Sequence, residues 1–254
     1  MHSALKFNLP NFIQPLDTTA WRVVEDQSIA STRKLVDSFE EHELLEQLIE
    51  QVKPEIPQQQ PDFLGLHYLL FTPFRYPPLQ YGSRFGNRST PALWYGSDSV
   101  ATALSEVAFY RLYFLRASNA DFGVTEVRLT AFAADISTTS ALDLTAPPFA
   151  QYTAAISAKT SYSVSQALGQ QMRDANINAF QYYAARSKET AINIALFTPK
   201  AFKTKQPKAN CWQTWICIAD QQSVEFYARR RNDFPNQRFR ATDFMVAGVF
   251  PTPN

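Results

Sequence analysis

Hydrophobic residues follow two spacings along the chain, and together they predict a mixture of strands and helices. Short apolar runs and alternating positions predict strands, whereas apolar positions repeated every three or four residues predict helices. Helices are expected near 99–116 and 163–175. The interleaving of both patterns from Leu66 onward predicts an α+β fold. Strands are expected at 21–25, 67–74, 92–97, 122–130, 178–183, 193–197, 211–219 and 223–229.

Residues 1–63 are expected to form an N-terminal accessory region. Ser31 can cap a helical pair over 31–53, because its hydroxyl can accept hydrogen bonds from first-turn amides. Apolar residues recur at helical spacing in this segment, at Leu44, Leu45, Leu48, Ile49 and Val52. Three prolines and several glutamines in 53–63 then end the helix, which predicts a linker or surface crossing. Residues 64–254 are expected to form the main domain.

One long segment follows neither spacing. Residues 129–158 are rich in alanine and threonine without clear periodicity. A stretch of this kind is typical of irregular structure. We expect it to cross the surface as a long irregular excursion.

Composition predicts a globular protein with no strong overall electrostatic field. The 254 residues are 45% hydrophobic and 14% aromatic, which supports a sizeable core. The 24 basic and 23 acidic residues nearly cancel, so nothing draws the whole protein to nucleic acid or an anionic membrane. Any recognition of phosphate must be local. The first residues lack a signal-peptide core and no run approaches the ~20 apolar residues of a spanning helix, so we expect a cytoplasmic protein without membrane contact.

Cysteine and histidine give no sign of a metal site. Cys211 and Cys217 stand six positions apart, which would place both thiols on one face of a buried strand. Free core thiols are expected there rather than a disulfide or a metal site. The three histidines, His2, His42 and His67, are scattered along the chain. We therefore expect no bound metal.

A lone acid stands in the otherwise apolar helix expected at 99–116. Glu106 shares a helical stripe with small and aromatic residues, namely Thr102, Ala103, Phe109, Tyr110 and Tyr113. An unpaired charge out of water is costly, so this carboxylate needs an explanation. It either pairs with a nearby arginine such as Arg111 or Arg116, or serves a site.

The segment before that helix favours a site. Gly82 and Gly86 flank the tripeptide Ser-Arg-Phe, which lets the backbone approach a ligand while Arg84 offers a planar fork for phosphate. Arg75 could act in the same way nine residues earlier. Tyrosines at 76, 81 and 95 add flat rings. Two arginines, tyrosines and one acid fit a dinucleotide, although no Gly-x-Gly-x-x-Gly fingerprint or phosphate loop ending in Gly-Lys-Ser/Thr is present.

Several separated segments, in order, resemble the RES domain family, which is named for an Arg, a Glu and a Ser. They are "WRVVEDQSIAST", "FTPFRYPPLQYGSRFG", "PALWYGSDSVATALSEVAFYR" and "NAFQYYAARSKETAINIALFTPKAF". Members of the family are bacterial toxins of toxin–antitoxin pairs that consume NAD⁺. The resemblance implies a compact mixed-sheet core similar to ADP-ribosyltransferase toxins, with 64–254 as the catalytic domain and NAD⁺ as substrate.

The resemblance also assigns roles to individual residues. It places Arg75, Tyr76 and Arg84 in the NAD⁺ pocket, Tyr95 on a strand that faces nicotinamide, and Glu106 as the helix acid. Arg22 in "WRVV" competes for the role of the first arginine. Arg75 is preferred because "FRYPPL" is continuous with the rest of the motif.

One position departs from the family. Where the family has tyrosine-x-serine-alanine-arginine, this chain has "YYAAR", so Ala184 occupies the serine position and Ala185 and Arg186 follow. Ser187 is out of register and does not replace it. The alanine is explained either by natural divergence with reduced activity or by an alteration that allows a toxic protein to be expressed, and we favour the second.

The resemblance implies a reaction and a partner. Nicotinamide departure leaves positive charge on the ribose carbon, which Glu106 would stabilise, and water or inorganic phosphate would accept the ADP-ribose. A cognate helix-turn-helix antitoxin of the Xre type is expected to block the pocket and to provide the only contact with DNA. The alternatives are an ADP-ribosyltransferase that modifies one cellular protein and a degenerate nucleotide-binding module.

Overall fold

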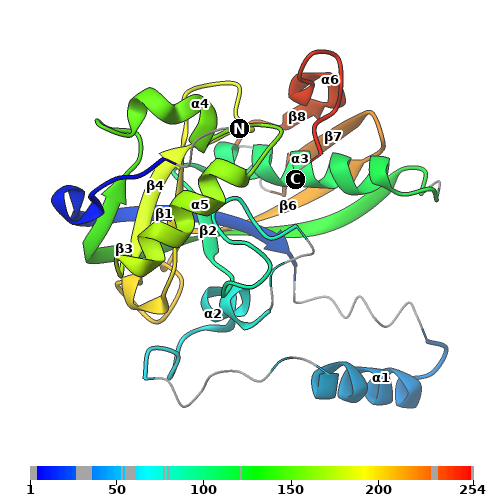
Figure 1. Cartoon of the computed structure of the whole chain (residues 1–254). Helices are drawn as coiled ribbons and strands as arrows, with labels where there is room; N and C mark the ends of the chain where they lie inside the picture. The colour runs from blue at the N-terminus through cyan, green and yellow to red at the C-terminus, as the bar shows by residue number, and fades with distance from the viewer. Residues whose placement is uncertain are drawn as a thin grey trace.

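The structure is a computed structural model of the chain, and it describes residues 5–26, 36–52, 54, 61–76, 78, 81–120, 122–229 and 234–252. Within these ranges one mixed sheet has the strand order β1-β2-β5-β4-β3-β6-β7-β8 (Figure 1). The strands are β1 (Gln14–Glu25), β2 (Trp94–Ser97), β3 (Thr125–Asp143), β4 (Ala179–Tyr183), β5 (Ile192–Leu196), β6 (Trp212–Ala219), β7 (Ser223–Ala228) and β8 (Gln237–Arg240).

Helices connect and cover these strands. They are α1 (Phe39–Val52), α2 (Tyr68–Arg75), α3 (Val100–Ala117), α4 (Thr153–Ile156), α5 (Ser163–Asp174) and α6 (Ala241–Phe244), with short 3-10 turns η1 (Leu9–Phe12), η3 (Ala150–Tyr152) and η4 (Pro199–Ala201). The predicted α+β class, the mixed sheet and the two helices expected at 99–116 and 163–175 are confirmed. In the described residues, no helix is both long enough and apolar enough to cross a membrane.

Half of the sheet closes on itself. β1 pairs with β2 on one side and with almost the whole length of β3 on the other, while β3 also runs parallel to β4 at its end. The strands β1-β2-β5-β4-β3 therefore surround an inner core. Side chains from all five strands meet there, among them Ala20, Trp94, Ile194, Ala179 and Phe132. Helix α2 covers this inner core with Leu69 and Leu70.

Two further clusters lie on the outer face of the sheet. Helix α3 packs Leu104, Phe109 and Leu112 against β6 and β7. Helix α5 packs Leu168 and Met172 against the outer side of β4 and β5. Because neighbouring residues of a strand point to opposite faces, Trp94 enters the inner core while the next residue, Tyr95, faces the outer cluster. The outer face between α3 and α5 is where the predicted acid and Arg84 are found.

Two predictions of secondary structure are wrong. Residues 67–74, expected as a strand, form α2, which begins where the His67 ring accepts a hydrogen bond from the Leu69 amide at 3.2 Å. The first half of the irregular excursion predicted for 129–158 is strand, because β3 continues to Asp143, and the second half is turns with η3 and α4. The alanines of β3 are buried on both faces of the closed sheet, which removes the apolar–polar alternation that normally marks a strand.

The N-terminal region contributes to the same sheet. β1 lies within the first 63 residues and pairs with β2 and β3. The boundary at residue 63 stays a prediction. Ser31 and most of the predicted linker 53–63 lie outside the described residues. Helix α1 lies apart from the sheet (Figure 1), and its exposed apolar side chains are Phe39, Leu44, Leu48 and Val52.

Candidate functional site

A tight turn at residues 83–86 positions Arg84. The Ser83 amide donates to the Gly86 carbonyl at 2.6 Å, and Gly82 before it has φ +72°. A Cβ on Gly82 would lie 2.2 Å from the Gly86 oxygen, so only glycine fits. Gly82 therefore serves the turn itself, and its predicted use as a point of ligand approach stays a prediction. Phe85 is fully buried against Phe180 and Tyr182.

Helix α5 packs directly on this turn. A Cβ on Gly169 would lie 2.1 Å from the Phe85 carbonyl oxygen. The Gln166 side chain also donates to the carbonyl oxygens of Tyr81 and Ser83, each at 3.1 Å. The backbone on either side of Arg84 is thus held by the helix, so the arginine starts from a fixed position.

Arg84 is nearly fully buried, with 7% of its surface exposed. One Nη1–H donates to the Ala158 carbonyl at 2.7 Å, and the guanidinium lies 4.7 Å from the ring centre of Tyr162. Burial alone would lower the pKa of Arg84, but the nearby tyrosine hydroxyls and the Glu106 carboxylate outweigh it and raise that pKa. The residue is a firmly charged cation on the outer face of the sheet.

Tyr95 connects β2 to the turn. Its hydroxyl lies 2.9 Å from Ser83 Oγ and accepts from the Phe85 amide at 3.2 Å. Burial raises the pKa of Tyr95 to about 12, although hydrogen bonds from Ser83 and Phe85 oppose this. The phenol is therefore neutral at physiological pH, and it can position a ring but carries no charge.

Glu106 projects from α3, whose first turn is capped by Ser99 accepting from the Thr102 amide at 3.1 Å. The Asn193 side chain donates from Nδ2 to Glu106 Oε1 at 2.7 Å. Ser97 donates in turn to Asn193 Oδ1 at 2.7 Å, which fixes the orientation of the amide.

Arg111 and Arg116 were the two candidates for a structural ion pair with Glu106, and both have other partners. Arg111 pairs with Glu25, and Arg116 donates from Nη1 to the Gln221 carbonyl at 3.0 Å. Within the described residues, Glu106 forms no ion pair. Its carboxylate is held by one neutral amide instead, which leaves the negative charge available to a ligand.

Arg186 is a residue of this cluster to which sequence reasoning gave no role. Its guanidinium carbon lies 3.4 Å from the ring centre of Phe109, one turn of α3 beyond Glu106, and only 3% of Arg186 is exposed. None of its three guanidinium nitrogens has a hydrogen-bond partner in the described part of the chain. Burial lowers the pKa of Arg186, and the charge of Arg84 acts in the same direction. Its place two residues after Ala184 in "YYAAR" was the available signal.

Three tyrosines complete the cluster and were also missed as a group. The hydroxyls of Tyr110 and Tyr162 lie 2.9 Å apart, and Tyr182 is packed against Phe85. Burial first, and then the neighbouring Tyr162, raise the pKa of Tyr110 well above the ordinary value. Burial first, and then the Glu106 carboxylate, raise the pKa of Tyr182 in the same way. Tyr110 is the member that reaches the surface, since 44% of it is exposed.

The predicted pair Arg75 and Tyr76 lies elsewhere. Arg75 ends α2, which covers the inner core, and its Nε donates to the Pro54 carbonyl. Arg22 is joined to the strand of Tyr95, because its Nη1 donates to the Tyr95 carbonyl at 2.7 Å. Burial lowers the pKa of Arg22 to about 10. The structure thus brings Arg84, Tyr95 and Glu106 to the outer face of the sheet. Arg75 and Tyr76 lie instead at the end of α2.

Ala184 lies in the turn after β4. Its amide donates to the Ala191 carbonyl at 2.8 Å, and the residue is half-buried. Ser187 does not replace the missing hydroxyl, because its Oγ accepts from the Glu189 amide at 3.3 Å within the same turn. Ala184 is close to the cluster in sequence, because Arg186 follows it by two residues.

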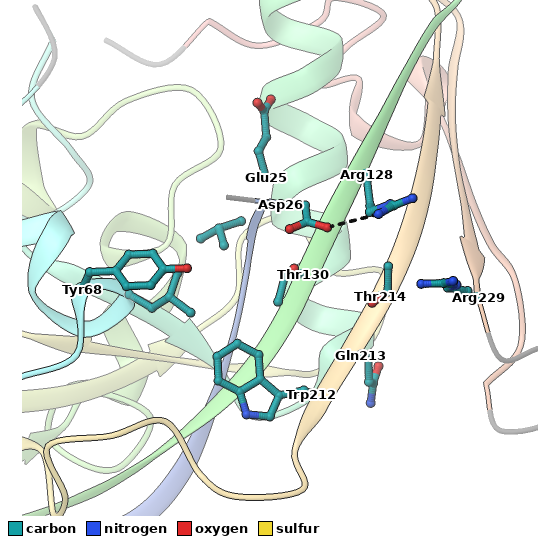
Figure 2. A pocket seen from close by; sticks show the side chains of 11 residues that line it. Glu25, Asp26, Tyr68, Arg128, Thr130, Trp212, Gln213, Thr214 and Arg229 are labelled. Carbon is teal, nitrogen blue, oxygen red and sulfur yellow. Dashed lines mark ion pairs between the residues drawn. The ribbon is translucent and has the colours of Figure 1, made fainter. Parts of the chain in front are cut away.

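Two pockets of the described surface lie away from this cluster. Figure 2 shows a pocket of about 390 Å³ between Tyr68 and Trp212, where Asp26 and Arg128 lie 3.8 Å apart. A neighbouring hollow of about 860 Å³ shares Trp212 and Arg229 with it. None of the predicted site residues lines either one. The buried charges of Arg84 and Arg186 and the unpartnered donors of Arg186 lie instead in the cluster between α3 and α5.

Comparison with known proteins identifies the family. A protein-family model described as "RES domain" matches residues 62–219, which is more than half of the chain. The chain belongs to the RES domain family. The matched range contains the residues discussed above from Arg75 to Arg186, whereas Arg22 lies before it.

Other comparisons with this RES domain protein add little. Comparison with curated proteins finds no match. A solved structure described as the crystal structure of the M. tuberculosis MbcT–MbcA toxin–antitoxin complex is 12% identical, with a TM-score of 0.41, and the alignment covers 83% of this chain and 87% of that chain. The site is therefore argued from its own geometry.

Proposed function

We propose that this RES domain protein is a bacterial toxin that cleaves the bond between nicotinamide and ribose in NAD⁺. The observation that carries the proposal is the outer-face cluster: Glu106, a carboxylate that forms no ion pair within the described residues, interacts electrostatically with the buried cations Arg84 and Arg186. Arginines suit a diphosphate, and a carboxylate suits a ribose carbon that becomes positive. Membership of the RES family adds support.

The reaction requires little of the protein beyond binding and charge. When the bond breaks, its electron pair leaves with nicotinamide, whose ring becomes neutral, and the ribose carbon becomes an oxocarbenium-like cation. Water adds to that carbon and loses a proton, which gives ADP-ribose, nicotinamide and one proton. Inorganic phosphate in place of water gives ADP-ribose 1″-phosphate. Glu106 stabilises the cation through its charge, and the amide of Asn193 holds the carboxylate in place.

The other residues bind the substrate. Arg84 is assigned to the diphosphate and the neutral phenol of Tyr95 to the nicotinamide end. The family resemblance also gives Arg75 and Tyr76 a role in the NAD⁺ pocket, but α2 covers the inner core, so the proposal rests on Arg84, Tyr95 and Glu106. Ala184 lacks the hydroxyl that would orient the substrate or the acceptor. Loss of one preorganised donor costs about 10²–10³-fold in rate, so this chain would be a weakened enzyme.

The test is the loss of NAD⁺ over time with the purified chain and its Ala184→Ser variant, with and without inorganic phosphate. We expect the serine variant to consume NAD⁺ about 10²–10³-fold faster. Glu106→Gln in the serine variant should abolish turnover and keep NAD⁺ binding. Unchanged turnover in the glutamine variant would refute the role of Glu106. A requirement for phosphate would identify the acceptor.

The same experiment separates the alternatives. Addition of ADP-ribose to a cellular protein, detected by mass spectrometry, would favour a protein-modifying transferase. Binding of NAD⁺ without turnover, even after Ala184→Ser, would favour a degenerate binding module. A toxin also requires an antitoxin, and we propose a helix-turn-helix protein of the Xre type that covers the cluster and supplies DNA binding. Inhibition of NAD⁺ loss by the protein encoded beside this chain would test that partner.

A further inference from the structure

Arg186 stands out among the buried arginines of the described residues. Arg84 donates to the Ala158 carbonyl, Arg22 to the Tyr95 carbonyl and Arg173 to the Pro91 carbonyl. Arg186 is as buried as any of them, at 3% exposed, but Nε, Nη1 and Nη2 all lack a partner. A buried guanidinium with no acceptor is costly, so it calls for an explanation, and a bound anion would supply the missing acceptors.

The contact with Phe109 leaves these donors usable. The guanidinium lies over the phenyl ring at 3.4 Å, so its flat face is occupied. The N–H groups lie in the plane of the guanidinium and point away from that ring. Stacking therefore holds the fork in one orientation without using a single donor. This arrangement suits bidentate binding of a phosphate.

A chain of aromatic contacts connects Arg186 to Arg84. Phe109 contacts Tyr110 at 5.2 Å between ring centres, and the Tyr110 hydroxyl lies 2.9 Å from that of Tyr162. Arg84 in turn lies over the Tyr162 ring. Two guanidinium groups thus flank one tyrosine pair, and the only carboxylate described beside them, Glu106, is already bonded to Asn193. The cluster carries an excess of one positive charge, which an anionic ligand would neutralise.

We propose that Arg186 binds the diphosphate of the nucleotide ligand together with Arg84, and that this pair selects ligands carrying a diphosphate. The inference rests on the proposed function for the identity of the ligand. It gives Arg186 a part in the pocket beside Arg84, where the sequence had offered Arg75, with Arg22 as its competitor, as the first arginine. The diphosphate would approach Phe109 and the tyrosine pair on the outer face, while the ribose next to nicotinamide would reach Glu106.

The experiment measures binding of NAD⁺, ADP and adenosine by calorimetry, with the full chain carrying Glu106→Gln to prevent turnover. In that background Arg186→Lys keeps the charge but loses the fork, and Arg186→Gln loses both. We expect affinity for NAD⁺ and ADP to fall about 10-fold with lysine and more with glutamine, while affinity for adenosine stays the same. Equal affinity for ADP in the parent chain and in Arg186→Lys would overturn the proposal.

A matched control is available in Arg173. This arginine is also stacked on a phenyl ring, at 4.5 Å from the centre of Phe197, but it donates to a carbonyl. Arg173→Lys should leave the affinity for ADP unchanged. If Arg186→Gln does not fold, inorganic pyrophosphate decides: at the same concentration it should raise the melting temperature of the parent chain more than that of Arg186→Lys. An equal rise in both would show that Arg186 only packs on Phe109.

Failure of this inference and failure of the proposed function give different results. In one case the Ala184→Ser chain consumes NAD⁺ but Arg186→Lys does not change ADP binding. That result would refute the role of Arg186 and support the NAD⁺-cleaving enzyme. Binding of ADP that depends on Arg186, without any loss of NAD⁺, would keep the diphosphate site in a protein that is not an NAD⁺-cleaving enzyme.

Discussion

Asn193 donates a hydrogen bond to the Glu106 carboxylate at 2.7 Å and thereby joins β5 to α3. The amide is itself oriented by Ser97. Because Glu106 is the acid of the proposed reaction and has no cationic partner among the described residues, this single neutral donor determines where its charge lies. Asn193 is thus a positioning residue, which acts through Glu106.

Removal of the Asn193 amide should lower turnover without removing substrate binding. In the Ala184→Ser chain we expect Asn193→Ala to reduce the rate constant for NAD⁺ cleavage about 10²-fold, since the carboxylate loses its orientation. Asn193→Asp places a second carboxyl beside Glu106, and like charges oppose ionisation of both. The acid limb of its pH–rate profile should therefore move to higher pH.

The control for this prediction is Asn178→Ala. The Asn178 side chain donates to Thr138 Oγ1 at 3.1 Å, away from the cluster. A purely structural role for Asn193 predicts equal effects of the two alanine variants and no movement of the pH profile in Asn193→Asp. That result would contradict the assignment.

Gly169 should resist replacement although it stands inside a helix. Alanine normally stabilises a helix relative to glycine by about 0.5–1 kcal/mol. At this position, however, the added Cβ would lie 2.1 Å from the Phe85 carbonyl oxygen. We expect Gly169→Ala to lower the melting temperature and, by shifting the turn that carries Arg84, to weaken ADP binding. Gln170→Ala, at an exposed position of the same helix, should do neither.

Much of the fold could be predicted where one face of an element is buried and the other is not. The helix at 163–175 and the strands at 211–219 and 223–229 follow that rule, and the structure contains them as α5, β6 and β7. The long strand β3 does not follow it, because Ala131 and Phe132 are both buried, on opposite faces. A run of alanines covered on both sides has no amphipathic period to detect.

The site was predictable to the extent that residue type alone is informative. Arg84, Tyr95 and Glu106 stand in one continuous segment, and the structure places all three on the outer face. Arg186 comes from a turn some eighty residues later, and its unpartnered nitrogens are a property of packing. Its place in "YYAAR" was the available local signal, but the absence of partners on its guanidinium is visible only in the assembled fold.

The two cysteines should differ in reactivity. Burial raises the pKa of the Cys217 thiol to about 11, so almost no reactive thiolate is present at pH 8. Cys217 is fully buried in β6, whereas Cys211 precedes the strand and is partly exposed. Iodoacetamide at pH 8 should modify Cys211 in the native chain and Cys217 only after unfolding, as mass spectrometry of peptides would detect. Equal modification of both in the native state would contradict the packing of β6.

Asp135 should make stability depend on pH at the acid end. Its Oδ1 accepts from Lys208 Nζ at 2.9 Å and from Thr19 Oγ1 at 2.6 Å, which lowers the pKa of Asp135 below 3.8. A carboxyl whose pKa is lowered by folding stabilises the fold above its unfolded pKa, and that contribution is lost as the pH falls through the folded value. Because the pair is largely exposed, the effect is screened and small.

Thermal unfolding of Asp135→Asn from pH 7 to pH 2 would measure this contribution. At pH 7 we expect the variant to melt about 1–3 °C below the parent. Below pH 3.8 the two melting temperatures should converge, because the parent carboxyl becomes protonated there. Asp17→Asn on strand β1, which removes the more exposed pair with Lys203, provides the control and should change the melting temperature less. A difference between Asp135→Asn and the parent that stays constant down to pH 2 would show that Asp135 acts as a neutral hydrogen-bond acceptor between β1 and β3, with no contribution from its charge.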